Sequence, residues 1–387
     1  MGETRSQIER WLSAAIESVN PVELTRQALV GPPATVIAIG KAAAGMCRGA
    51  AEALDAVTGI CVTDVDDSVP EGIELLVGDH PIPGMASLEA GRRAIATVQS
   101  APGRIVALIS GGGSALCEMP RAGIDFPFIQ QTNRLLLRSG ASIEEANLVR
   151  GHLSAIKCGG LSRAAGRPIE TLVISDVAGA GPEVVASGPT FAMKFEPDRA
   201  RQTMEEYGVT VPDRIWEAMS RPPDRPSETT VEVLADGKSA AEAAASAARS
   251  DRYEASVSRQ WISGPLATRL DRFLDGPKQG VSIAVGEATL EVTGEGSGGR
   301  NSHAALLAAT RIVGTGSVFA GFATDGVDGP SDSAGAIVDG STILRGGDPA
   351  ESLANFDSAN YLQETGDLLP TRTTGTNVGD LWLIHNE

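Results

Sequence analysis

The stretch RIVALISGGGSALCEMP, residues 104–120, joins an apolar, β-branched run to three consecutive glycines and then returns to apolar residues. An apolar run that ends in glycine is typical of a strand buried on both faces, as in parallel sheets covered by helices. The glycines indicate a tight turn from strand into helix, where another group approaches the backbone closely. Three explanations fit: a nucleophilic serine, a bound phosphate, and a turn that glycine serves only by packing.

The same pattern recurs along the chain and predicts its fold class. Short apolar runs alternate with longer helical patterns, which is typical of an α/β fold. We expect two α/β domains with mostly parallel, Rossmann-like sheets. The other runs that resemble buried strands are residues 34–40, 170–176, 232–236, 281–293, 317–325 and 381–386.

A proline-rich segment marks the expected domain boundary. SRPPDRPSETT, residues 220–230, follows a helical pattern and precedes a new strand, as a linker does. A chain of 387 residues is also long for one hydrophobic core. We therefore expect an N-terminal domain of residues 1–230 and a C-terminal domain of residues 231–387, with the last strand free to cross back to the first domain.

Composition and charge exclude several classes of partner. The formal charge is −17 and the acidic residues are spread along the chain, which argues against a surface for nucleic acid or anionic membranes. No apolar stretch approaches the roughly twenty residues of a membrane span, and the first residues lack the apolar core of a signal peptide. Four scattered cysteines without a C-x-x-C pair argue against a disulfide scaffold. We expect a cytoplasmic protein with buried, reduced cysteines.

The glycine run at 111–113 matches a nucleophile elbow only in part. Gly112 and Ser114 fit the first half of G-x-S-x-G, but Leu116 occupies the last glycine position. The four histidines are far apart in sequence and none lies in a recognisable triad context. Because a triad histidine need not be near its serine in sequence, the pattern disfavours a hydrolase without excluding it.

A second glycine-rich run raises the case for an anion site. In TGEGSGGRNSHAALLAA, residues 293–309, Gly294, Gly296 and Gly299 satisfy G-x-G-x-x-G after a predicted strand. This pattern is typical of a dinucleotide site and therefore of a dehydrogenase. Arg300 follows the last glycine, and its forked cation suits a transferring phosphoryl group or a carboxylate at least as well.

A third segment resembles a nucleotide loop but lacks its first glycine. EVLADGKSAAEAAASAA, residues 232–248, places Gly-Lys-Ser after a predicted strand, as a Walker loop does. The first glycine of that motif would stand at position 232, which is Glu232. If ATP binds this chain, it does not bind through a P-loop.

Charged residues follow several predicted strands, where ligands bind in open parallel sheets. Lys41 comes directly after the first strand and could stabilise charge on a phosphoryl group, although a lysine that only extends into solvent fits equally well. Asp176, Asp325 and Asp328 lie in loops after strands and carry the oxygen ligands that suit Mg²⁺. One or two of them could instead only satisfy N–H groups of their turns.

An ordered series of motifs resembles the class II glycerate kinases, whose C-terminal region is called the MOFRL domain. The series runs from about residue 8 to the C-terminus and comprises VIAIGKAAAGM, GDHPIP, ALISGGGSAL, NLVRGHLSAIKCGGL, LVISDVAGAGPEVVASGPT, GEGSGGRNSHAALLAA, FATDGVDGPSDSAGAIVD and TGTNVGDLWL. The resemblance implies ATP-dependent phosphorylation of D-glycerate, usually at the 2-hydroxyl, with Mg²⁺ and in a cleft between two α/β domains. The proposed catalytic lysine and arginine of that family fall on Lys41 and Arg300.

The motifs and the resemblance together name the expected site residues. Asp176, Asp325 and Asp328 are the expected metal ligands. We expect the 110–114 turn to hold glycerate or ATP phosphates, with its serines as hydrogen-bond donors. The full set of expected substrate- or nucleotide-binding residues is Ser110, Gly111, Gly112, Gly113, Ser114, Arg150, Ser187, Gly296, Gly298, Gly299 and Asn301.

Two other functions stay open. Members of this family have often been labelled hydroxypyruvate reductases, so NAD(P)H-dependent reduction of hydroxypyruvate is the alternative activity. A regulator that binds a nucleotide or sugar acid without turnover is the third possibility. The sequence leaves open whether the product is 2- or 3-phosphoglycerate, and it leaves the oligomeric state open, with a homodimer as one option.

Overall fold

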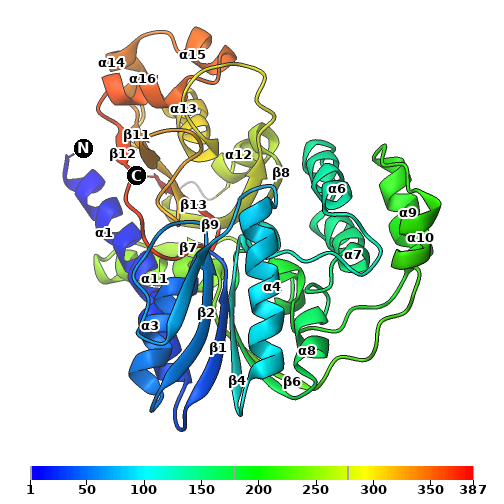
Figure 1. Ribbon diagram of the computed structural model, residues 1–387. Helices are drawn as coiled ribbons and strands as arrows, with labels where there is room; N and C mark the ends of the chain where they lie inside the picture. The colour runs from blue at the N-terminus through cyan, green and yellow to red at the C-terminus, as the bar shows by residue number, and fades with distance from the viewer. Residues whose placement is uncertain (1, 178, 277–278, 387) are drawn as a thin grey trace. The chain divides into compact units, whose positions relative to one another are not determined.

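The chain folds into two compact units (Figure 1). We call them the parallel-sheet unit and the mixed-sheet unit. The computed structural model describes residues 2–177, 179–276 and 279–386. The parallel-sheet unit contains residues 21–175 and 180–234, and the mixed-sheet unit contains residues 1–20, 176–179 and 235–387.

The parallel-sheet unit is built on a six-stranded sheet with the strand order β3-β2-β1-β4-β5-β6. The pairs β2–β3, β1–β2, β1–β4 and β4–β5 are parallel, as expected from the sequence. This order is that of doubly wound folds, with a topological switch point between β1 and β4. The strands are β1 (Ala34–Ile39), β2 (Val57–Thr63), β3 (Ile73–Val77), β4 (Ile105–Ser110), β5 (Ile169–Ile174) and β6 (Thr229–Ala235).

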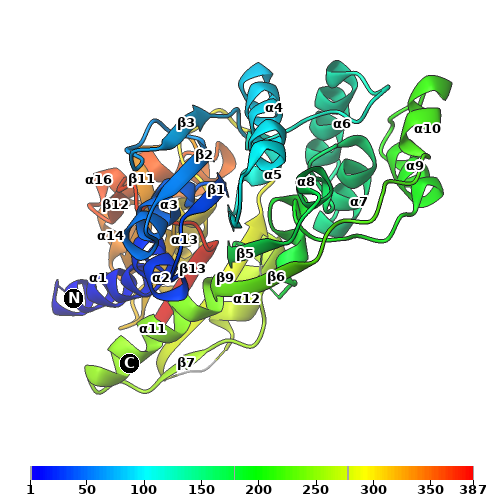
Figure 2. The ribbon, with the colours of Figure 1, turned by 60° about the horizontal axis from the view of Figure 1, so that its bottom comes forward.

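Helices cover this sheet and also form a separate apolar cluster. Helices α3 and α4 pack against β1 and β2 (Figure 2). Residues of α6, α7, α9 and α10 share a second core that includes Ile129, Val149 and Met204. The helices are α2 (Pro21–Ala28), α3 (Ala43–Ala53), α4 (Met85–Ser100), α5 (Gly113–Leu116), α6 (Phe126–Arg138), α7 (Ile143–Leu153), α8 (Gly160–Ala165), the 3-10 helix η1 (Pro182–Ser187), α9 (Pro197–Glu206) and α10 (Asp213–Met219).

The mixed-sheet unit contains the order β12-β11-β10-β13-β9-β7, with β8 also paired to β9. Its helices are α1 (Gly2–Ser18), α11 (Gly237–Ser250), α12 (Leu266–Leu274), α13 (Arg300–Ile312), α14 (Thr342–Gly346), α15 (Ala350–Ala354) and α16 (Ser358–Glu364). Its strands are β7 (Ala255–Val257), β8 (Ile262–Pro265), β9 (Gly280–Thr289), β10 (Val318–Ala323), β11 (Ser333–Asp339), β12 (Leu368–Pro370) and β13 (Asp380–Asn386).

The strand directions of this second sheet correct the expectation of mostly parallel sheets. β10 pairs antiparallel with β11 and β13, and β9 pairs antiparallel with β13, whereas β7 and β8 run parallel to β9. Only residues 324–332 connect β10 to β11, which is too short for the crossover that a parallel pair needs. β13 is buried along nearly its whole length, so its apolar run looks like that of a parallel strand whatever its direction.

The two ends of the chain both lie in the mixed-sheet unit. β13 lies between β10 and β9, so the C-terminal strand does not cross back to the other unit. Helix α1 packs along α11, with Ile8 and Trp11 buried and Trp11 Nε1 donating a hydrogen bond to Asp251 at 2.8 Å. The expected boundary at residue 230 is close to the change of unit after Leu234, but residues 1–20 group with the C-terminal half.

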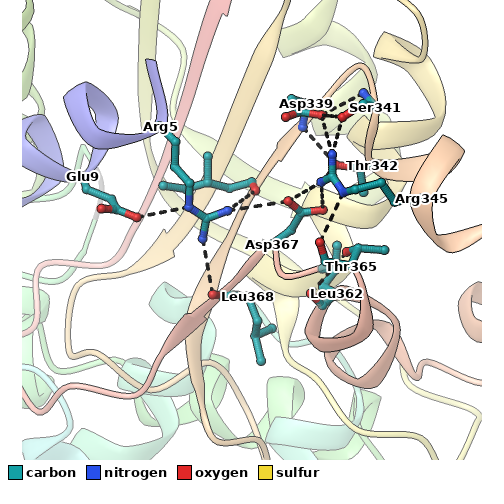
Figure 3. Close-up of polar contacts among 11 residues, drawn as sticks. Arg5, Glu9, Asp339, Ser341, Thr342, Arg345, Leu362, Thr365, Asp367 and Leu368 are labelled. Atoms are coloured by element: carbon teal, nitrogen blue, oxygen red, sulfur yellow. Dashed lines mark hydrogen bonds and ion pairs between the residues drawn. The ribbon is translucent and has the colours of Figure 1, made fainter. Parts of the chain in front are cut away.

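A buried carboxylate anchors α1 to the mixed sheet (Figure 3). Asp367 is 3% exposed and accepts hydrogen bonds from Arg345 on both oxygens, at 2.6 and 2.7 Å. Arg5 of α1 lies 3.6 Å from the same carboxylate and donates to the carbonyls of Ile337 and Leu368. These long-range contacts explain why the first helix belongs to this unit, which helical periodicity alone does not reveal. Among the described residues no helix is long and apolar enough to cross a membrane.

Glycine at position 40 lets the ends of β1 and β4 approach each other. Gly40 has φ +128°, and a Cβ on it would lie 2.3 Å from Ser110 Oγ and 2.4 Å from the Ser110 carbonyl oxygen. Immediately beyond it, the Lys41 N–H donates to Gly111 O at 2.9 Å and the Ala42 N–H donates to Ser110 Oγ at 3.1 Å. The two loops at the switch point are therefore hydrogen-bonded to each other, and no side chain fits between them at position 40.

Replacing Gly40 should destabilise the parallel-sheet unit. We expect Gly40→Ala to lower the free energy of unfolding by more than about 2 kcal/mol. Alanine would have to adopt a strained positive φ there, and its Cβ would overlap the atoms of Ser110. Gly103→Ala is the matched control, since no atom lies within 4 Å of its Cβ position; it should change stability by less than about 1 kcal/mol. Urea unfolding of both variants measures this, and equal losses would contradict the assigned role of Gly40.

Candidate active site

The glycine run after β4 makes room for neighbouring side chains of the same unit. Gly112 has φ +82°, and a Cβ there would lie 3.2 Å from Lys41 Cγ. A Cβ on Gly113 would lie 2.7 Å from the Cβ of Ala186. The groups that come close to this backbone are thus the Lys41 side chain and the segment at residue 186. Lys41 lies at the switch point of the sheet, where doubly wound proteins bind ligands.

Ser110 and Ser114, the two serines that flank the glycines, have different surroundings. Ser110 is fully buried and its oxygen accepts the Ala42 N–H. We therefore give it a structural role, which is to join the loop after β4 to the loop after β1. Ser114 is partly exposed and its Oγ lies 2.7 Å from Ser187 Oγ. Ser187 is fully buried and hydrogen-bonds to Asn147 Oδ1, also at 2.7 Å.

The backbone next to these serines is strained. Ala186, Ser187 and Cys158 all have positive φ, at +51°, +59° and +52°. Residues without glycine's freedom adopt this region at a cost of about 1–3 kcal/mol each, and such residues cluster at functional sites. The Cys158 N–H donates to Ser187 O at 2.9 Å, which holds two of the strained residues together. The strain therefore coincides with the Ser187–Ser114 pair.

Arg150 is the other expected cation of the parallel-sheet unit. Its Nε donates to Asn133 Oδ1 at 2.8 Å, and burial lowers the pKa of the guanidinium from its ordinary value. A buried ion pair joins Lys157 to Glu118, whose side chains are each 1% exposed, and sequence patterns alone do not reveal it. Both residues follow apolar runs, and no local signal marks them as partners across 39 positions.

The cysteines are buried, as expected from the sequence. Burial raises the pKa of Cys117 to about 12, although Lys157 acts to lower it. Burial likewise raises the pKa of Cys158 to about 12. Protonated, enclosed thiols are poor nucleophiles. We therefore give neither cysteine a chemical role.

Arg300 begins α13 in the mixed-sheet unit and is held by two carboxylates. Its Nε lies 3.1 Å from Asp380 Oδ2, and its Nη1 pairs with Glu287. Burial acts to lower the pKa of Arg300, but Asp380 and Glu287 together raise it above its ordinary value. Asn301 Nδ2 donates to the other Asp380 oxygen at 2.9 Å. The arginine is thus fully charged, 36% exposed and fixed in orientation.

The G-x-G-x-x-G run is already occupied by the chain itself. The N–H groups of Gly296, Ser297 and Gly299 donate to Asn355 O, Asp357 Oδ1 and Ser302 Oγ. A Cβ on Gly296 would lie 2.5 Å from the Cβ of Asp357, so these glycines serve close packing. Backbone amides that are bonded internally are not free to hold a pyrophosphate. The amides of Gly296 and Gly299 are thus engaged within the unit, and the expected role of Gly296, Gly298 and Gly299 in substrate or nucleotide binding stays a prediction.

Asp328 takes the place that an anion would occupy at the start of α13. Its Oδ1 accepts the Asn301 N–H at 2.8 Å and its Oδ2 accepts the Ser302 N–H at 2.7 Å. Asn301 also uses its side-chain amide on Asp380, so its donors are engaged within the unit. The alternative that an aspartate satisfies N–H groups therefore describes Asp328, and its expected role as a metal ligand stays a prediction.

The remaining acidic candidates are Asp176 and Asp325. Asp325 is half-buried and its Oδ1 accepts the Val327 N–H at 3.1 Å. Among residues 2–177, 179–276 and 279–386, no group of three His, Cys, Asp or Glu side chains is placed to hold a metal ion. Mg²⁺ commonly takes one or two carboxylates and completes its shell with water and phosphate oxygens. Asp176 and Asp325 fit that use as hard oxygen donors.

Fold and side chains together define a two-unit α/β protein with a lysine at the switch point of one sheet and an arginine at a helix start in the other unit. Residues 7–220 match the family model described as Domain of unknown function (DUF4147), and residues 280–380 match the MOFRL family. The chain is 34% identical to D-glycerate 2-kinase of Thermotoga maritima over 89% of each chain.

Two further comparisons extend this similarity. The crystal structure of glycerate kinase from Thermotoga maritima matches with a TM-score of 0.86 and 31% identity over 100% of both chains. A relative from Agrobacterium vitis, named only provisionally as a hydroxypyruvate reductase, is 34% identical over 98% of this chain and 94% of its own. The chain belongs to the glycerate kinase family, as its motifs indicated.

The buried partner of Arg300 gives a pH-dependent stability. Burial raises the pKa of Asp380 to about 7, more than Arg300 lowers it, and Glu287 and Asp328 add to the rise. A carboxyl whose pKa is higher in the folded than in the unfolded state stabilises the fold at pH values below its unfolded pKa. That stabilisation is lost as the pH rises through its folded pKa. We therefore expect wild-type stability to fall relative to Asp380→Asn between about pH 4 and pH 7.

Urea unfolding at pH 5 and pH 8 measures this difference. Asp271→Asn is the control, because it removes an exposed carboxylate of the same unit that pairs with Arg311. The stability of Asp380→Asn relative to wild type should increase between the two pH values, whereas that of Asp271→Asn should stay nearly constant. A constant difference for Asp380→Asn would show that its carboxyl does not titrate in this range.

Proposed function

We propose that this protein transfers the γ-phosphoryl group of ATP to D-glycerate, at the 2-hydroxyl. The observation that carries the proposal is Lys41, which lies on the glycine turn at the switch point of the parallel sheet. Similarity to D-glycerate 2-kinase over 89% of both chains supports the choice of substrates. ATP is the phosphoryl donor, and Mg²⁺ is the metal that such a transfer uses.

Each residue has a role in this proposal that follows from its surroundings. Lys41 and Arg300 stabilise negative charge on the transferring phosphoryl group, because both are cations at ligand-binding positions of their units. Arg150, buried beside Asn133, binds the carboxylate of glycerate. Asp176 and Asp325 would hold Mg²⁺, which when bound neutralises charge on the phosphate oxygens.

The geometry disfavours the reductase alternative. A dinucleotide would need free amides in the run after β9, and those of Gly296, Ser297 and Gly299 are bonded within the chain. One pair of assays separates the two activities. Protein with D-glycerate, Mg²⁺ and ATP should form ADP, whereas protein with hydroxypyruvate and NADH or NADPH should not oxidise the nucleotide. Oxidation without ADP formation would make the protein a reductase, and neither reaction would leave a binding protein.

The same assay identifies the phosphorylated hydroxyl. Purified enolase dehydrates 2-phosphoglycerate directly and requires a mutase before it can use 3-phosphoglycerate. We expect phosphoenolpyruvate to appear with enolase alone. A product that enolase accepts only after addition of the mutase would move the reaction to the 3-hydroxyl.

Removal of Lys41 should stop turnover without unfolding the protein. We expect Lys41→Ala to lower kcat by about 10²-fold or more, the usual loss for one group that stabilises the transition state. Lys194→Ala is the control, because the Lys194 side chain is 81% exposed and pairs only with Glu196 among the contacts described. Steady-state ADP formation measures both variants. Near-normal turnover of Lys41→Ala would remove this lysine from the mechanism.

Arg300→Ala should also lower kcat by at least about 10²-fold, since a forked cation at the phosphoryl group contributes strongly to rate. The matched variant is Arg311→Ala on the same helix, whose guanidinium also pairs with two carboxylates, Asp271 and Asp275. Turnover of Arg311→Ala should stay within about twofold of wild type. Equal losses in the two variants would mean that helix α13 and not the Arg300 cation determines the rate.

A further inference from the structure

The direction of one chain of hydrogen bonds in the parallel-sheet unit can be deduced from its buried end. Asn147 is 1% exposed, and its Nδ2 donates to the carbonyl oxygen of Val184 at 3.0 Å. A carbonyl oxygen can only accept, so the amide cannot be turned the other way without placing two acceptors against each other. The side-chain oxygen of Asn147 therefore faces Ser187.

The next two links follow from the number of protons available. Asn147 Oδ1 has no proton, so the Ser187 hydroxyl must donate to it across 2.7 Å. A serine hydroxyl has one proton, and Ser187 has used it. In the 2.7 Å contact between Ser187 Oγ and Ser114 Oγ, Ser187 must therefore accept and Ser114 must donate. The chain of donors runs from Ser114 through Ser187 to Asn147.

Ser114 consequently presents only lone pairs to anything else that approaches it. Its oxygen would repel a carboxylate or phosphate oxygen, which carries no proton at neutral pH, and it would attract an O–H or N–H donor. This result reverses the expectation that Ser114 is a donor to an anion. Ser114 is partly exposed, whereas Ser187 is fully buried, so the chain ends where a ligand can reach it.

The surroundings of Ser114 belong to the proposed substrate site. It lies in the turn whose Gly112 is packed against Lys41, and the strained residues Ala186 and Ser187 hold the far side of the contact. Backbone strain of this kind persists only where the surrounding structure imposes it, and it clusters at functional sites. A sugar acid brings both anionic oxygens and hydroxyl groups, and only its hydroxyls match an acceptor.

We propose that Ser114 accepts a hydrogen bond from a hydroxyl group of the acceptor substrate, and that Asn147, acting through Ser187, is the positioning residue that makes Ser114 an acceptor. This inference rests on the proposed function, because it assigns the substrate of that reaction to this turn. It gives the site a means to prefer hydroxy acids over simple carboxylic acids of the same charge. Arg150 then binds the carboxylate of the acid, and Ser114 accepts a hydrogen bond from its hydroxyl.

The test compares four acids that differ only in their hydroxyl groups. D-Glycerate carries two, D-lactate has only the 2-hydroxyl, 3-hydroxypropionate has only the 3-hydroxyl, and propionate has none. The KM for D-glycerate and the competitive inhibition constants of the other three are measured for wild type and Ser114→Ala. We expect Ser114→Ala to weaken D-glycerate and one of the two monohydroxy acids by about 3–10-fold and to leave propionate unchanged. The acid that is weakened identifies the hydroxyl.

Two outcomes would overturn the proposal. An equal loss for all four acids, propionate included, would mean that Ser114 donates to the carboxylate. No loss for any acid would mean that Ser114 does not touch the substrate. Ser139→Ala, which removes an exposed hydroxyl at the end of α6 that bonds only to the carbonyl of Leu136 among the described contacts, is the control and should change none of the constants.

Asn147→Ala tests the positioning role separately. Without the amide oxygen, Ser187 can turn its proton toward Ser114, and the preference for the affected hydroxy acid over propionate should fall to that of Ser114→Ala. Adding Asn147→Ala to Ser114→Ala should then cause no further loss of preference. A purely structural role would lower affinity for all acids and keep the preference, which would overturn the assignment. If wild-type protein forms no ADP with D-glycerate, the proposed function fails; if it does and the preferences do not change, only this inference fails.

Discussion

The close approach of β1 and β4 at their carboxyl ends is the constraint on which the parallel-sheet site depends. Gly40 has no side chain because the Ser110 hydroxyl and carbonyl occupy that space. The amides of Lys41 and Ala42 then bond to the loop after β4, so both loops leave the sheet in fixed directions. One consequence is that the Lys41 side chain lies on Gly112. The glycine run therefore leaves room for the Lys41 side chain and for Ala186, which pack directly against its backbone.

In the glycine-rich run of the mixed-sheet unit, the glycines pack against other parts of the chain and their amides are bonded within it. A helix start attracts negative charge, and here the carboxylate of Asp328 supplies it from within the chain. The site keeps a cation instead, since Arg300 extends from the same helix start between Glu287 and Asp380. Two carboxylates hold that guanidinium in one orientation and also offset its charge.

Much of the fold could be predicted from the sequence, because strands and helices are local patterns. The α/β class and most of the buried strands follow from apolar runs. The run at 232–236 is an exception, because β6 is mostly exposed and belongs to the parallel-sheet unit. The antiparallel directions around β13 could not be predicted in this way, since a strand buried on both faces has the same composition in either direction. The position of α1 could not be predicted either, because its helical periodicity indicates an apolar face but not the element against which that face packs. That element is α11, about 240 positions away, and Arg5 adds a contact with the buried Asp367.

The sequence by itself determined which chemical groups follow the strands: Lys41, the 110–114 turn and the aspartates of two loops, with Arg300 at a helix start. It also determined the family, through motifs that are continuous in the chain. Only the tertiary structure decided what each group does there. It assigned Asp328 to a helix start, engaged the amides of the second glycine run, and turned the Ser114 hydroxyl into an acceptor through Ser187 and Asn147. The physical reason is that a hydrogen bond has a direction, and that direction depends on partners that folding brings together from distant parts of the chain.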